Sequence, residues 1–170
     1  MNRYFALPLF AMFAMALHGQ SNPLSADAKR AFNGIKNNIL KSAERMSEED
    51  YSFKPAPTVR SFGQLVGHVA DYHYIFCGPA IGESKNPDIE NTKKSKADLI
   101  AALKESMAYC DAIFDALTDA KAAEVVTVEN RQRTRLAALY TAITHDNEHY
   151  GNMVTYMRIK GLVPPSSGGQ

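Results

Sequence analysis

The chain has 170 residues, with 19 Lys and Arg against 18 Asp and Glu, and only two cysteines. This length suits one domain with a short appendage. A formal charge of +1 provides no basic field for a phosphate backbone, so we expect no nucleic-acid partner. Two cysteines exclude both a disulfide-dense mini-fold and a zinc site made of four thiolates.

Residues 1–19 have the pattern of a secretory signal peptide. Arg3 supplies a positive charge, an apolar run covers Tyr4–Leu17, and Ala14-Met15-Ala16 offers the small residues that a signal peptidase accepts. The run contains Pro8 and is shorter than the roughly 20 residues that cross a membrane, so we expect no stable membrane anchor. We therefore expect an exported protein, periplasmic or extracellular.

The first half of the remaining chain predicts two helices. Apolar residues recur at threes and fours over Leu24–Met46, which is the period of a helix. Pro55 and Pro57 prevent a helix in the next segment, which we expect to be a loop. The helical period returns over Ser61–Phe76 and ends at Gly78-Pro79. A polar connection of about 17 residues follows, which is long for a compact bundle.

The second half begins with a third helix. Its first turn has Ser95 three residues before Asp98, a pairing typical of a helix N-terminus, and the apolar period continues to Leu117. The β-branched run Val125–Glu129 has no apparent partner strand. We therefore expect an extended loop there rather than a sheet.

The fourth helix is predicted over Thr134–Lys160, and Gly161 stops it. Four helices of this length predict an all-α fold, a single four-helix bundle. We assign the bundle to residues 20–165 and a flexible tail to residues 166–170.

Two histidines on the fourth helix are candidate metal ligands. His145 and His149 are four residues apart, an advance of about 400°, so both rings leave one face and can share one ion. Asn152 and Tyr156 lie on the same strip with small residues, which suits the lining of a cleft between helices. Two solvated imidazoles are the alternative interpretation.

A third ligand has to come from another helix, where His68 and His73 are the candidates. Their directions differ by about 140°, so we do not expect both to reach the same ion. His68 lies at the edge of the apolar face beside Gly67, whose missing side chain allows close approach. His73 falls within that face, and we expect a core histidine with one hydrogen-bond partner.

Several segments, in their order along the chain, resemble the DinB/YfiT superfamily of metalloenzymes. Together they span essentially the whole chain after residue 19. They are Phe62–Asp71, His145–Asn152, Tyr156–Arg158, Gly161 and Pro164-Pro165. The resemblance implies one ligand early in the second helix and two in the last. In this chain these positions are His68, His145 and His149. It also implies helices in up-down-down-up order, with a long connection between the second and third.

Three neutral imidazoles would hold a divalent ion and leave positions open for water or substrate, as catalytic sites do. Imidazole ligands suit several metals, so the cofactor is expected to be Zn, Ni or Fe without a choice among them. Further residues are candidates to orient the ligands or to line the pocket. These are Asp71, Tyr72, Asp146, Glu148, Asn152 and Tyr156. Asp146 is the favoured acid because it falls between the apolar arc and the histidine pair, and a surface carboxylate is the alternative for each acid.

The superfamily includes thiol-dependent transferases and a thiol-dependent isomerase. The resemblance therefore implies a metal-dependent enzyme, of hydrolase or thiol-transferase type, with a small-molecule substrate. A non-catalytic bundle that binds a metal or small ligand is the alternative, and a purely structural bundle is the third hypothesis. A homodimer is left open.

The two cysteines test the order of the helices. Cys77 lies about 24 Å along the second predicted helix and Cys110 about 22 Å along the third. Parallel helices would bring the thiols level, whereas antiparallel helices would separate them. The helix order implied by the resemblance is parallel, so a disulfide is expected in an oxidising compartment. Two buried thiols are the alternative.

Overall fold

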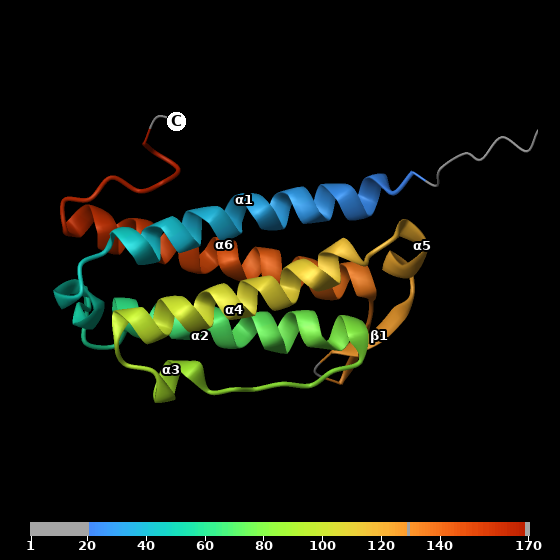
Figure 1. The fold of residues 1–170 in the computed structure, drawn as a ribbon, viewed down its shortest axis with the longest axis horizontal. Helices are drawn as coiled ribbons and strands as arrows, with labels where there is room; N and C mark the ends of the chain where they lie inside the picture. Colours follow the sequence, from blue (N-terminus) through green and yellow to red (C-terminus); the bar gives the residue numbers. More distant parts are fainter. Residues whose placement is uncertain (1–20, 129, 169–170) are drawn as a thin grey trace, which may run out of the picture.

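The computed structural model describes residues 21–128 and 130–168. Its four long helices lie side by side along the long axis of the molecule (Figure 1). They are α1 (Pro23–Arg45), α2 (Phe62–Cys77), α4 (Lys96–Asp115) and α6 (Arg135–Ile159). The prediction of a four-helix bundle is confirmed. The predicted signal peptide lies outside the described residues.

The helices run in up-down-down-up order. Figure 1 shows α1 and α6 running one way and α2 and α4 the other. Contacts between α2 and α4 advance together along both helices, as parallel helices require. His73 bonds to Ser106, and one turn further Cys77 and Cys110 form a disulfide with Cα atoms 5.6 Å apart. The implied parallel pair is therefore present.

Short elements occupy the connections. They are η1 (Glu49–Ser52), η2 (Gly78–Ile81), α3 (Ile89–Thr92) and α5 (Asp119–Ala122). The long connection between α2 and α4 thus carries η2 and α3. Ser166, the start of the predicted tail, bonds to the Tyr150 hydroxyl of α6.

The segment before α6 is a hairpin, and the prediction of an extended loop there is wrong. Strand β1 (Val125–Val128) pairs antiparallel with β2 (Arg131–Thr134), with Val128 opposite Arg131. Asn130 in the turn has a φ of 62°, a conformation that Asn tolerates better than most residues. The second strand is polar and mostly exposed, so it carries no apolar alternation that would reveal it.

Side-chain caps stabilise the N-termini of the two helices that carry the histidines. Ser61 begins α2 with a capping box, because its hydroxyl accepts the Gln64 N–H while the Gln64 side chain accepts the Ser61 N–H. Thr134 caps α6 by accepting the Ala137 N–H. The hydrophobic core fills the space between the four helices. None of the helices in the described part of the chain is long and apolar enough to cross a membrane.

Candidate metal centre

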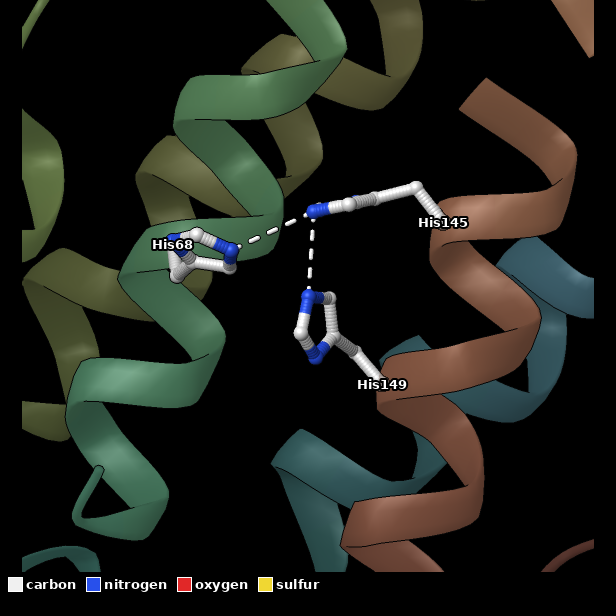
Figure 2. Close-up of side chains that lie close together, drawn as sticks. All are labelled: His68, His145 and His149. Carbon is white, nitrogen blue, oxygen red and sulfur yellow. Dashed lines mark hydrogen bonds between the residues drawn. The ribbon is translucent and has the colours of Figure 1, made fainter. Parts of the chain in front are cut away.

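Three histidines from two helices converge on one point. His68 extends from α2, and His145 and His149 extend from successive turns of α6 (Figure 2). The Nε2 atom of His145 lies 3.2 Å from that of His68 and 3.0 Å from that of His149. One ligand atom from each ring lies within 4.8 Å of the others. The structure thus brings together the three residues proposed as ligands.

This spacing fits a metal ion. Zn–N bonds of about 2.0–2.1 Å at tetrahedral angles place two ligating nitrogens about 3.3 Å apart. The two contacts at His145 are close to that value. The donor set contains three imidazoles and no carboxylate or thiolate. It would therefore leave the charge of a divalent ion unneutralised and leave coordination positions open.

The surroundings keep the rings in the neutral form, which is the form that ligates. His68 and His149 are buried and His145 is partly buried. Burial lowers the pKa of His145 to about 3, and the neighbouring rings add to the shift. Burial also lowers the pKa of His68 and of His149, with the positive charge of Arg60 adding to both. The ring nitrogens are therefore available to a cation at neutral pH.

Glu90, on α3, orients His68 and was missed by the sequence analysis. His68 Nδ1–H donates to Glu90 Oε2 over 3.0 Å, an arrangement that presents Nε2 to an ion. Asp71 holds the α3 backbone in place, because its two carboxylate oxygens accept the Ile89 and Glu90 N–H groups at 2.7 and 2.9 Å. Asp71 therefore acts on the ligand through Glu90 rather than by direct contact.

Gly67 is required for this arrangement. A Cβ at Gly67 would lie 2.7 Å from the Glu90 Cα atom and 3.0 Å from its backbone nitrogen. Any larger residue would push α3 off α2 and withdraw the carboxylate from His68. The sequence predicted that another segment packs closely against Gly67, beside His68. That segment is the backbone of α3.

The other two ligand rings have different neighbours. The Asn152 amide lies 3.3 Å from His149 Nδ1, and its oxygen and nitrogen can exchange places by a flip. With the oxygen toward the ring, Nδ1–H donates and Nε2 keeps its lone pair. Tyr72 stacks on His145 with ring centroids 4.5 Å apart, while His145 Nδ1 is buried without a hydrogen-bond partner among the described residues.

Asp146 does not bond to a ligand ring. It is fully buried and bonds to His73, with Oδ2 3.1 Å from His73 Nε2. His73 is the expected core histidine, with two side-chain partners rather than one, because its Nδ1 lies 2.8 Å from Ser106 Oγ. The position of Asp146 on the helix, between the apolar face and the histidine pair, suggested a role beside the ligands. Packing instead directs its side chain into the core.

A cavity of about 750 Å³ opens beside His149. His149 and Asn152 line it, together with Glu148 and Tyr156 of the same helix. The loop before α2 forms another wall with residues 54, 55 and 57–60. The Tyr156 hydroxyl donates to the Arg60 carbonyl over 2.8 Å and so links the two walls. A small molecule in this cavity would contact the His149 face of the centre.

Comparison with known proteins identifies the family. The sequence pattern of the DinB superfamily matches residues 31–153. The chain belongs to the DinB superfamily. A curated relative, the uncharacterised protein YjoA of Bacillus subtilis strain 168, is 28% identical over 122 residues, which are 70% of this chain and 79% of YjoA.

Solved structures of other proteins have a fold similar to that of this chain. YfiT from Bacillus subtilis, described as a probable metal-dependent hydrolase with an unusual four-helix bundle topology, aligns with a TM-score of 0.64 at 17% identity, over 85% of this chain and 92% of YfiT. A mycothiol-dependent maleylpyruvate isomerase aligns with a TM-score of 0.64 at 12% identity, over 76% of this chain and 60% of the isomerase. At these identities the likeness shows the fold alone.

Proposed function

We propose that this DinB superfamily chain is an exported metal-dependent enzyme of hydrolase or thiol-transferase type. His68, His145 and His149 would hold a divalent ion through their Nε2 atoms. The convergence of these atoms at 3.0 and 3.2 Å is the observation that carries the proposal. YfiT, described as a probable metal-dependent hydrolase, and the mycothiol-dependent isomerase share this fold and add support.

The surrounding residues have defined tasks in this proposal. Glu90 and Asn152 fix the ring orientation of His68 and His149, and Tyr72 restrains His145 by stacking. A bound divalent ion would supply a Lewis acid that stabilises developing negative charge on a substrate. The cavity beside His149 would admit the substrate to that charge.

Metal content tests the proposal directly. Protein purified without a nickel column should carry about one divalent ion per chain, and His145→Ala should carry less than about a tenth of that amount because only two of three ligands remain. Elemental analysis of dialysed protein measures both. Glu148→Gln is the matched control, since Glu148 lies between the two ligands on α6 but is exposed. A metal-free wild-type protein, or equal metal in His145→Ala, would contradict the proposal.

Export is a separate part of the proposal. It is supported by the pattern of residues 1–19 and by the disulfide between Cys77 and Cys110, which persists in oxidising compartments. Cell fractionation after expression of the full chain should find a shortened product outside the cytosol. Accumulation of the full-length chain in the cytosol would contradict export.

A further inference from the structure

Arg60 is a positive charge built into the wall of the cavity that His149 also lines. Its position is fixed from two sides. The guanidinium Nε–H donates to Glu90 Oε1 over 2.9 Å, and the backbone carbonyl accepts the Tyr156 hydroxyl over 2.8 Å. A long surface side chain ordinarily loses rotamer freedom when it binds a ligand, and the contact of Nε with Glu90 reduces that loss in advance.

Most of the hydrogen-bonding capacity of this guanidinium is unused. Its Nη1 and Nη2 groups have no partner among the described residues, and 43% of the side chain is exposed. Both Glu90 oxygens already accept a hydrogen bond, Oε1 from Arg60 Nε–H and Oε2 from His68 Nδ1–H. The remaining N–H groups can therefore pair with a planar or tetrahedral oxyanion that enters the cavity.

The charges around the cavity favour the binding of an anion once a divalent metal ion occupies the three-histidine centre. Lys54 and Arg60 are offset by Glu90 and Glu148, the two carboxylates of the same lining. The three rings are neutral, so the net charge of the occupied site equals that of the ion. A molecule with one anionic end near the ion and another near Arg60 would match this distribution.

We infer that Arg60 is the residue that recognises the substrate, by binding an oxyanion group, a carboxylate or a phosphate, while another group of the same molecule faces the three histidines. The substrate class is then a small organic anion. This inference rests on the proposed function, because it needs an ion at the three-histidine centre. It assigns Arg60 a role in binding and none in the chemical step.

Matched pairs of probes test the inference. The Co²⁺-loaded protein is titrated with succinate and butanoate, then with glutarate and pentanoate, and the visible absorption of the cobalt gives each Kd. Each diacid differs from its monoacid by one carboxylate. That group should improve binding about 10-fold in the wild type through a charge-assisted bidentate contact. Replacing succinate by 3-phosphonopropionate distinguishes a phosphate-like group from a carboxylate.

Arg60→Met should make each diacid bind no better than its monoacid, while the Kd of the monoacids and the cobalt stoichiometry stay unchanged. Arg60→Lys should keep part of the preference, since the charge remains but the forked geometry is lost. Arg30→Met, which removes an exposed arginine that pairs with Asp27 on α1, is the matched control and should behave as wild type. Circular dichroism checks that the variants are folded.

The outcomes separate the two proposals. A wild-type protein that binds no cobalt overturns the proposed function, and the inference with it. A protein that binds one cobalt per chain but shows equal affinity for diacid and monoacid overturns the inference alone. The same holds if the diacid preference survives in Arg60→Met.

Discussion

Asp146→Ala is expected to lower the free energy of unfolding by about 3–5 kcal/mol, the cost of removing one partner from a buried pair. Asp146 is fully buried, and His73 is 1% exposed. The variant would remove the partner of His73 Nε2, which lies in the core. A small cavity in α6 would add to the loss.

The hydrogen-bond pattern shows why the loss is large. Ser106 donates its hydroxyl proton to the Leu103 carbonyl over 2.9 Å, so its oxygen accepts from His73 Nδ1–H. One proton therefore lies between His73 Nε2 and Asp146 Oδ2. This chain of bonds joins α4, α2 and α6 at the level of the candidate centre. Its loss would loosen the helices that hold His68 and His145.

Urea unfolding at neutral pH, followed by circular dichroism, measures the effect. Asp27→Ala is the control, because Asp27 is exposed on α1 and such substitutions change stability by less than about 0.5 kcal/mol. The double variant His73→Leu/Asp146→Leu should be more stable than Asp146→Ala, since no polar group is then left unpaired. A loss below about 1 kcal/mol in Asp146→Ala would show that the pair does not stabilise the core.

Reduction of the Cys77–Cys110 disulfide is expected to cost about 3–4 kcal/mol, because the bond closes a loop across 33 residues and restricts the unfolded chain. The loop contains the connection that carries Glu90 and α3. Cross-linking the ends of α2 and α4 thus limits the freedom of the segment that orients His68. The native contacts of both helices remain after reduction, so the protein should still fold.

Comparing oxidised and reduced wild-type protein isolates the cross-link. The urea midpoint should fall by roughly 1.5–2 M after reduction, given a typical urea dependence of about 2 kcal/mol per M. Cys77→Ala/Cys110→Ala should unfold near the reduced wild type and should not respond to the reductant. Identical midpoints for oxidised and reduced protein would contradict the prediction.

The periodic features of the chain were predictable from the sequence. Apolar residues at helical spacing located the four long helices, and a separation of four residues placed His145 and His149 on one face because this spacing nearly completes a turn. His68 followed from its place at the edge of an apolar face beside Gly67. The family of the chain followed from the order of these segments.

Other features depend on contacts between residues that are distant in sequence. Glu90 lies in a polar connection without periodicity, and it reaches His68 only because Asp71 binds the α3 backbone and Gly67 leaves room for it. The hairpin could not be predicted from the hydrophobic pattern, because its second strand is polar. It is defined by the pairing of its two strands.

By itself, then, the sequence determined the helices, their apolar faces and the residue types of the three ligands, since these depend on spacing along one helix. Only the tertiary structure decided which carboxylate forms a hydrogen bond with which histidine. Asp146 and Glu90 have the same chemistry, but a carboxylate pairs with whatever the packing of its helix brings within about 3 Å. Packing directs Asp146 to the core at His73 and Glu90 to the centre at His68.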